Sequence, residues 1–244
     1  FRPKQSLGQN FLSDQNYVNK IVDAFSCTSK DGCRVVELGP GPGALTRMLF
    51  QKYPRMTGIE VDQRAIEFLK EKIPHANILH QDVLKVDWPQ RAAVSGGPLS
   101  VIGNLPYNIT SQILFSFIDS YKAVNKAVVT AQYEVAARIV AQPSTKQYGI
   151  LSVAFQLYST PTMNFKIPAS VFFPKPKVLS ALITLDFTRP HPDLHRVNIY
   201  QLRRLLLTSF QQRRKMLRTS LKDLLRNEDL TLPEEYQTKR PEEL

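Results

Sequence analysis

A glycine-rich turn between an apolar run and a helical stretch constrains the fold of this chain more than any other feature. Residues 34–38 predict a short buried strand, Gly39-Pro-Gly-Pro-Gly43 follows it, and residues 44–53 predict a helix. Other short apolar runs alternate with helical stretches, which predicts an α/β fold. These runs cover residues 56–60, 78–82, 99–103 and 125–130, and a closing hairpin is expected from residues 160–167 and 178–187.

The glycine loop has the properties of a ligand-binding turn. Glycine accepts positive φ and lets the backbone approach a ligand closely. Gly39, Gly41 and Gly43 give the spacing G-x-G-x-G, which differs from the dinucleotide pattern G-x-G-x-x-G. Pro40 and Pro42 remove N–H groups that a pyrophosphate would use, so the loop favours a nucleoside cofactor without a phosphate bridge. The alternative is a tight turn with no ligand.

Acidic residues end the next two predicted strands. Glu60 lies 23 residues after Glu37, which is close to the spacing at which an acid accepts hydrogen bonds from ribose hydroxyls. Asp82 ends the following strand and could accept from an adenine amino group, whereas Asp62 is expected to cap the helix that begins at Gln63. Each acid alone could be a solvated strand end. Their order on successive strands favours a cofactor site.

The stretch Asn104-Leu105-Pro106-Tyr107 follows a buried apolar run and precedes an amphipathic segment, residues 110–121. The Asn104 oxygen and the carbonyl of Leu105 or Pro106 can accept both hydrogens of a planar amino group, while Tyr107 stacks on the ring that carries it. The exocyclic amine of adenine is such a group. The alternative is a proline-containing turn with a core tyrosine.

The charge of the chain points to a polyanionic partner. Its 244 residues carry a formal net charge of +11. Residues 196–226 contain nine Lys or Arg and one acid, which gives this segment +8. Solvated helix faces are the alternative explanation, but the concentration of charge in one segment favours binding to nucleic acid.

Six motifs together resemble the rRNA adenine N6,N6-dimethyltransferase family of class I S-adenosylmethionine-dependent methyltransferases. They are Gln9–Leu12, Glu37–Gly43, Gln81–Leu84, Asn104–Tyr107, Phe172–Val178 and Arg213–Arg218. The resemblance implies a Rossmann-like sheet with a small C-terminal helical domain. It also implies methyl transfer from S-adenosyl-L-methionine to N6 of two adjacent adenines in the 3'-terminal hairpin loop of small-subunit rRNA, during ribosome biogenesis.

The resemblance also assigns residues. It implies cofactor contacts from Asn10, Leu12, Gly39, Gly41, Glu60, Asp82 and Asn104. It implies a catalytic group of Asn104, Leu105, Pro106, Tyr107 and Phe172, with the target adenine between the two aromatic rings. By alternation only one of Phe172 and Phe173 should face the pocket, and the motif's register favours Phe172. RNA contacts are expected from Arg213, Arg214, Lys215 and Arg218.

Two other functions share parts of this pattern. A resistance-type methyltransferase acting on large-subunit rRNA has the same cofactor fold, although Phe172–Val178 and the short basic lobe fit the small-subunit family better. An organellar transcription factor could keep the fold as a nucleic-acid-binding module. The intact motif at Asn104–Tyr107 favours the enzyme.

Two domains are expected, a methyltransferase domain at residues 1–188 and a basic helical RNA-binding lobe at residues 189–244. The lobe should contain two amphipathic helices, with Arg214 and Arg218 pointing together toward phosphate and a weakly structured tail after Asn227. The two Cys and four His residues show no metal-ligand spacing, and no apolar run is long enough for a bilayer. A monomer is expected. No targeting segment is visible, so the compartment stays open between bacterial cytoplasm, nucleus, mitochondrion and plastid; a targeting segment could precede Phe1.

Overall fold

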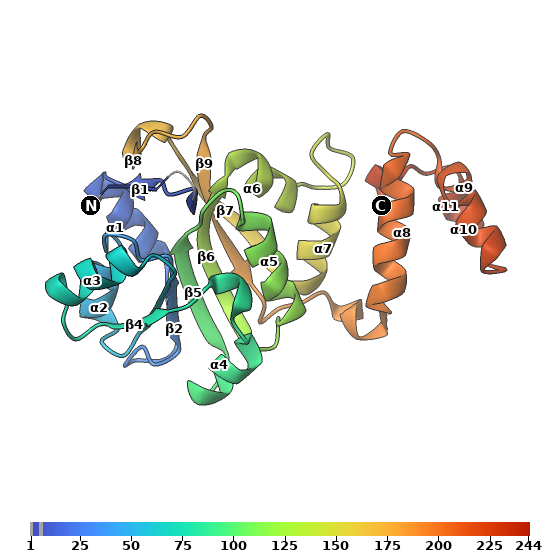
Figure 1. Cartoon of the computed structure of the whole chain (residues 1–244). Helices are drawn as coiled ribbons and strands as arrows, with labels where there is room; N and C mark the ends of the chain where they lie inside the picture. The colour runs from blue at the N-terminus through green and yellow to red at the C-terminus, as the bar shows by residue number, and fades with distance from the viewer. Residues whose placement is uncertain (1, 5–6) are drawn as a thin grey trace.

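A twisted sheet forms the centre of the computed structural model, which describes residues 2–4 and 7–244 (Figure 1). Phe1, Gln5 and Ser6 lie outside the described residues. The described part of the chain forms seven sheet strands in the spatial order β4 (Asn77–His80), β3 (Thr57–Glu60), β2 (Val35–Leu38), β5 (Leu99–Asn104), β6 (Val124–Gln132), β9 (Ser180–Asp186) and β7 (Thr160–Ile167).

The direction of the strands determines where a ligand can bind. Strands β4, β3, β2, β5 and β6 run parallel, and β9 runs antiparallel to both of its neighbours. Every strand predicted from an apolar run is present, and so is the closing hairpin, which confirms the predicted α/β fold. The carboxyl ends of the parallel strands meet at one edge of the sheet, where open α/β sheets bind their ligands.

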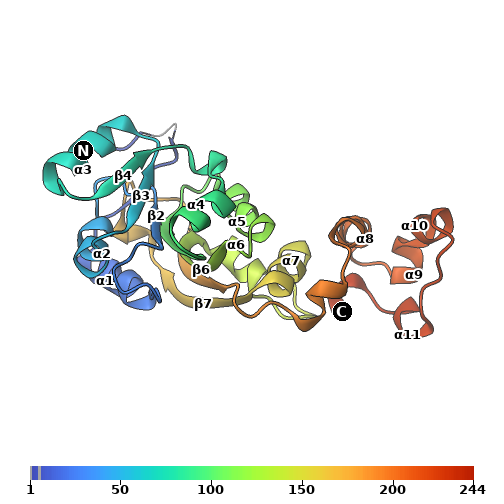
Figure 2. The same ribbon diagram turned by 90° about the horizontal axis from the view of Figure 1, so that it is seen from below.

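Helices cover both faces of the sheet (Figure 2). Alternate residues of a strand point to opposite faces, and Val128 and Val129 accordingly belong to two different hydrophobic clusters. One cluster includes residues of α4 (Trp88–Val94), α5 (Thr110–Asp119), α6 (Tyr133–Ile139) and α7 (Ile150–Tyr158). The other includes residues of α1 (Gln15–Ala24) and α2 (Thr46–Lys52), and α3 (Gln63–Lys72) packs beside β3 and β4.

The N-terminal segment pairs with a distant loop. Strand β1 (Phe11–Leu12) lies antiparallel to β8 (Phe172–Phe173), with Phe11 opposite Phe173 and Leu12 opposite Phe172. Short 3-10 turns at Val83–Lys85 and Ala169–Val171 precede α4 and β8. We call the segment before α1 the N-terminal arm and the β1–β8 pair the small ribbon. The small ribbon holds the arm beside the carboxyl edge of the sheet.

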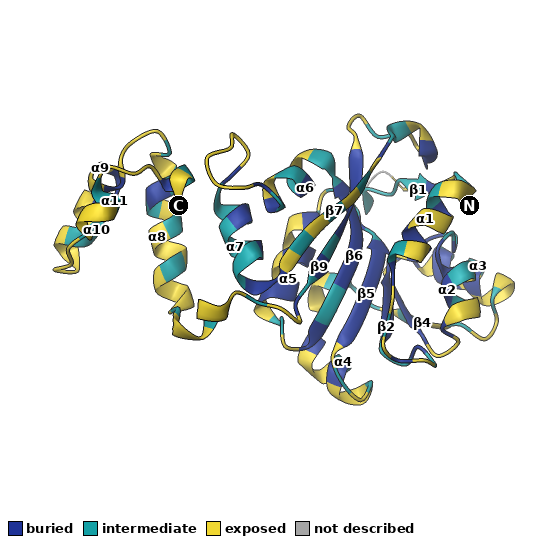
Figure 3. Cartoon of the chain, turned by 180° about the vertical axis from the view of Figure 1, so that it is seen from behind, coloured by how far each residue is buried: buried dark blue, intermediate teal, exposed yellow. Residues whose placement is uncertain are grey.

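The C-terminal lobe lies beyond α7, at the far end of the molecule from α3 (Figures 1 and 2). A 3-10 turn at Pro192–Arg196 leads into α8 (Ile199–Gln211), which packs beside α7. The lobe continues with α9 (Leu217–Ser220), α10 (Lys222–Asn227), α11 (Glu234–Gln237) and a 3-10 turn at Pro241–Glu243. Most residues of the lobe are exposed, whereas most residues of strands β5 and β6 are buried (Figure 3).

Two expectations about the lobe were wrong. Residues 212–216 form a turn between helices, so Arg214 and Arg218 do not share a helix face. The tail after Asn227 is not weakly structured, because it packs back on the lobe: the Leu217 N–H donates to the Lys239 carbonyl at 2.7 Å. Leu217 and Leu221 are both buried and form the inner side of this part of the lobe.

Among the described residues, no helix is long and apolar enough to cross a membrane. In the same part of the chain, no group of three or more His, Cys, Asp or Glu side chains could hold a metal ion.

Candidate active site

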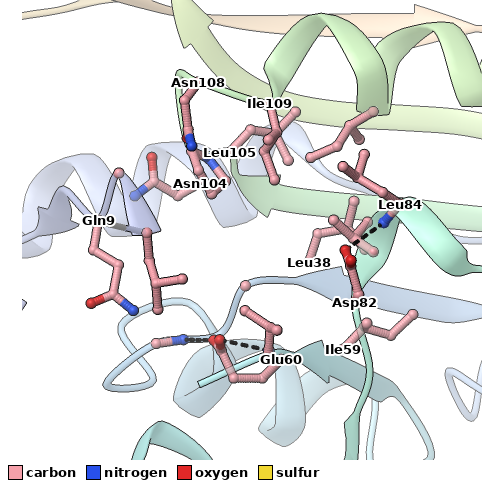
Figure 4. A pocket seen from close by; sticks show the side chains of 18 of the residues that line it. Gln9, Leu38, Ile59, Glu60, Asp82, Leu84, Asn104, Leu105, Asn108 and Ile109 are labelled. Carbon is pink, nitrogen blue, oxygen red and sulfur yellow. Dashed lines mark hydrogen bonds between the residues drawn. The ribbon is translucent and has the colours of Figure 1, made fainter. Parts of the chain in front are cut away.

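A cavity of about 250 Å³ opens at the carboxyl edge of the sheet (Figure 4). The ends of β2, β3 and β5, the segment after β4 and the N-terminal arm line it together. Its lining includes Gln9, Asn10, Gly39, Gly41, Glu60, Asp82, Asn104, Leu105 and Pro106. Every residue expected to contact a cofactor is therefore brought to this cavity except Leu12, which lines a small neighbouring cavity together with Glu37 and Asn104.

Glu60 holds the glycine loop in place. Its carboxylate is buried and accepts three backbone N–H groups, from Gly41 at 2.9 Å through Oε2 and from Val61 and Asp62 at 2.9 Å through Oε1. Gly41 has a φ of +55°, and a Cβ there would lie 2.8 Å from the Phe11 ring. A carboxylate has about four acceptor positions. Glu60 thus fixes the loop and retains an acceptor position for a ligand hydroxyl.

The two neighbouring aspartates cap helical turns. Asp82 accepts from the Leu84 N–H at 3.0 Å (Figure 4), and Asp62 accepts from the Arg64 N–H at 3.2 Å, as predicted for a helix cap. Hydrogen bonds from the Arg64 side chain lower the pKa of Asp62 to about 2. Gln9 also donates to Asp62 at 3.1 Å, which ties the arm to the rim of the cavity.

The amide of Asn104 is held from both ends. Its Nδ2 donates to the Asn10 carbonyl at 2.7 Å, and its Oδ1 accepts from the Thr130 hydroxyl at 2.6 Å. The Pro106 carbonyl already accepts from the Thr110 hydroxyl at 2.8 Å and from the Ile109 N–H at 3.3 Å. Since a carbonyl oxygen has two lone pairs, the Leu105 carbonyl is the better second acceptor for an amine.

Tyr107 is anchored by its hydroxyl. The phenol oxygen lies 2.5 Å from the hydroxyl of Ser180, a buried residue at the start of β9. Burial raises the pKa of the Tyr107 hydroxyl, which therefore stays protonated at neutral pH. Tyr107 is only partly buried, and it is not among the residues that line the cavity.

The structure does not support the preference for Phe172 as the second stacking ring. Phe172 is 3% exposed and packs in a hydrophobic cluster with Leu12 and Phe25, whereas Phe173 is 63% exposed. Alternation does leave one of the two rings accessible, as expected, but that ring belongs to Phe173. Because opposite residues of an antiparallel pair share a face, Phe173 lies on the same side of the ribbon as Phe11, which lines the cavity.

Sequence reasoning missed the role that Glu37 can play. Burial raises the pKa of this carboxyl to about 8. Its Oε2 has no hydrogen-bond partner among the described residues and lies beside the small cavity lined by Gly39 and Asn104. In the sequence, Glu37 is a polar residue within an otherwise apolar strand, and this pattern could have marked it as a candidate site residue. Thr130 in β6 and Ser180 in β9 show the same pattern.

The four basic residues expected to contact RNA divide into two groups. Arg213 is bound within the protein, because it donates to Glu242 at 2.5 Å and to the carbonyls of Lys146 and Thr145 at 2.6 and 2.8 Å. It thereby ties the tail and the loop before α7 to the lobe. Arg214, Lys215 and Arg218 are exposed, and they belong to the lobe that lies beyond α7 (Figure 1).

The sequence matches the family described as "Ribosomal RNA adenine dimethylase" over residues 1–242. The chain belongs to this family. As a member of the ribosomal RNA adenine dimethylases, the chain is a methyltransferase.

Relatives of this dimethylase include two bacterial proteins with the same name. It is 47% identical over 247 aligned positions to "Ribosomal RNA small subunit methyltransferase A" of Salinibacter ruber, covering 100% of this chain and 81% of that protein. It is 41% identical over 220 positions to the protein of that name from Chlorobium luteolum, covering 90% of this chain and 78% of the relative.

Solved structures share the dimethylase fold. A dimethyladenosine transferase from Plasmodium falciparum has a TM-score of 0.79 at 22% identity, over 96% of this chain and 92% of that one. The 23S rRNA methyltransferase ErmE has a TM-score of 0.67 at 24% identity, over 96% of each chain. At these identities the likeness shows the fold alone.

Proposed function

We propose that this dimethylase transfers methyl groups from S-adenosyl-L-methionine to N6 of two adjacent adenines in the 3'-terminal hairpin loop of small-subunit rRNA. One observation supports this above the others: two hydrogen bonds fix the amide of Asn104 at the edge of the cavity, which Leu105 and Pro106 of the same turn also line. The names of the bacterial relatives support the small subunit as the source of the RNA.

The cavity suits the cofactor. Gly39 has a φ of +62° and nothing within 4 Å of a would-be Cβ, so the backbone leaves room for a ligand at that point. Glu60 and Asp82 offer acceptors for the ribose hydroxyls and the adenine amine. The unpartnered oxygen of Glu37 offers one more polar group beside the small neighbouring cavity. The bound cofactor supplies an activated methyl group.

The residues around the target adenine mainly orient it. An exocyclic amine is a weak nucleophile because its lone pair is delocalised into the ring. Hydrogen bonds from the amine to the Asn104 oxygen and the Leu105 carbonyl would direct the lone pair at the methyl carbon, and orientation of this kind is a large part of catalysis. The base must leave its stack first, and stacking on Tyr107 offsets that cost by about 1–3 kcal/mol.

The exposed cations of the lobe would bind the RNA backbone. Arg214, Lys215 and Arg218 are accessible to phosphate, whereas Arg213 has the structural role described above. Because phosphate contacts carry no sequence information, the lobe contributes affinity and the cavity selects the adenine.

Primer extension tests the proposal. Reverse transcriptase stops at dimethylated adenine, so small-subunit rRNA from cells that lack this protein should be read through at the two adenines. Complementation with the intact gene should restore the stop. A stop that persists without the protein would contradict the proposal, and a lost stop in large-subunit rRNA would assign the enzyme to that RNA instead. Loss of transcripts with the stop intact would favour a transcription factor.

A further inference from the structure

Thr130 is a buried hydroxyl in the most apolar part of the sheet. It is 0% exposed, and its neighbours in β6, Val128, Val129 and Ala131, are apolar and equally buried. A valine of almost the same shape would fill this position without bringing a polar group into the core. The hydroxyl donates to Oδ1 of Asn104 at 2.6 Å, which satisfies it.

The strand register brings the two side chains together. Asn104, the last residue of β5, is the register partner of Thr130 in the parallel β5–β6 pair. Neighbouring strands in register point their side chains to the same face of the sheet. The position of the Asn104 amide therefore depends on two central strands as well as on the turn that follows it.

The hydrogen bonds also determine which end of the amide faces the ligand. The Asn10 carbonyl can only accept, so it selects Nδ2 of Asn104, and Oδ1 is then directed at Thr130. An amide oxygen accepts two hydrogen bonds. The Thr130 hydroxyl takes one position, and the other remains for a hydrogen of the target amine.

We propose that Thr130 is a positioning residue for methyl transfer: its hydroxyl fixes Oδ1 of Asn104 where the adenine amine must donate. The proposal rests on the proposed function of Asn104 as an acceptor. Thr130 itself is 0% exposed and is not among the residues that line the two cavities, so its effect on the reaction must pass through Asn104. It acts on the alignment of the reacting nitrogen, so its loss should affect turnover far more than binding.

The experiment compares Thr130→Val, Thr130→Ser and a matched control, Thr57→Val. Thr57 is a buried threonine at the start of β3, away from the carboxyl edge of the sheet where the cavity opens. Its hydroxyl accepts a hydrogen bond from Asn77 at 3.2 Å. Steady-state rates are measured with S-adenosyl-L-methionine and an RNA of the 3'-terminal hairpin, and cofactor affinity is measured by calorimetry. Thr130→Val should lower kcat about 10-fold, the effect of one hydrogen bond, with KM for RNA and cofactor affinity within about twofold of wild type.

The other two variants separate positioning from packing. Thr130→Ser keeps the hydroxyl and therefore the hydrogen bond to Asn104. Its kcat should stay within about threefold of wild type, which is a smaller change than the loss of that hydrogen bond would cause. Thr57→Val should leave kcat unchanged. A folded Thr130→Val enzyme with wild-type kcat would overturn the proposal, and so would a Thr130→Ser enzyme as slow as Thr130→Val. If Thr130→Val does not fold, Thr130→Ala replaces it with the same expectations.

The controls also distinguish this proposal from the proposed function. If the wild-type protein does not methylate the hairpin RNA, the proposed function fails. If the wild type is active and Thr130→Val is equally active, only the role of Thr130 is rejected.

Discussion

The sheet and the C-terminal lobe hold their functional side chains by different means. Asn104 and Glu60 stand at the ends of buried strands. Asn104 is hydrogen-bonded to Asn10 and Thr130, and Glu60 accepts from Gly41 and from the two residues that follow it. Arg214 and Arg218 stand on a turn and a four-residue helix at the surface. The difference teaches that chemistry requiring exact alignment is placed on rigid strands, whereas attraction to a polyanion needs only accessible charge. Substitutions in the two regions should therefore affect different measurements.

Phe172→Ala should have the largest effect on stability. Truncating a buried phenylalanine typically costs about 3–5 kcal/mol, and Phe172 lies in a cluster shared by the arm and the sheet. Phe173→Ala, at an exposed ring, should change the free energy of unfolding by less than about 0.5 kcal/mol. Urea titrations measure both. A Phe172→Leu variant that folds but loses methyl transfer, beside a fully active Phe173→Ala, would return the stacking role to Phe172.

Asn104→Ala should have the largest effect on turnover. Removing one group that aligns or stabilises the reacting atoms commonly lowers kcat about 10²–10³-fold. Affinity for the RNA should stay within about twofold, because the phosphate contacts that we propose come from the lobe and not from Asn104. Single-turnover rates and filter binding separate the two. Equal losses in rate and RNA affinity would mean that Asn104 contributes to general binding of the RNA.

Glu60→Ala should weaken cofactor binding. Each lost hydrogen bond to a charged acceptor is worth about 1.5–3 kcal/mol. Part of the loss would come from the glycine loop, whose Gly41 N–H would lose its partner. Calorimetry gives the affinity, and RNA binding to the lobe serves as the internal control. Unchanged cofactor affinity in a folded variant would remove Glu60 from the cofactor site.

Glu37 should make the stability of the sheet depend on pH. Its pKa is raised from 4.5 to about 8, so between these values the folded protein keeps a proton that the unfolded chain has lost. The free energy of unfolding should therefore fall with rising pH, by up to about 1.4 kcal/mol per pH unit from this residue, and level off above pH 8. Urea titrations from pH 5 to pH 8 should show a smaller slope for Glu37→Gln. Identical slopes would show that Glu37 is ionised in the folded protein.

Of these predictions, we expect the smallest effect from neutralising Arg214 and Arg218, and we expect it in RNA binding alone. Replacing both by Gln should reduce the log–log salt slope of RNA binding by about 1–2 units and leave cofactor affinity unchanged. Arg213→Gln is the matched contrast, since Arg213 is bound to Glu242 and to the loop before α7. It should lower the stability of the lobe. A wild-type salt slope in the double variant would identify these arginines as a solvated surface.

The sequence was sufficient to predict the strands and most of the cavity. The glycine turn follows one buried strand, and polar residues end the next strands along the chain. Because parallel strands end at the same edge of the sheet, these residues are expected to lie together there. Gly39, Glu60, Asp82 and Asn104 therefore meet in the structure as their positions predicted. Local patterns are enough here because each residue is placed by its own strand.

The rest depended on contacts between distant segments. Alternation could show that one of Phe172 and Phe173 faces outward, but which one depends on pairing with β1. The partners of Arg213 lie 29 and 67 residues away, so no local pattern could distinguish it from Arg214. The bond from Thr130 to Asn104 likewise requires the register of two strands.

The three backbone hydrogen bonds of Glu60 also bear on how tightly a ligand can bind. One of them joins the Gly41 N–H to Glu60 and the other two hold the carboxylate against its own turn, so the ordering of the glycine loop belongs to the free energy of folding. A ligand that enters such a preorganised loop does not lose affinity to loop entropy. Variants that loosen the loop should consequently lose thermal stability and ligand affinity in proportion. The two quantities would then report a single equilibrium between an ordered and a disordered loop.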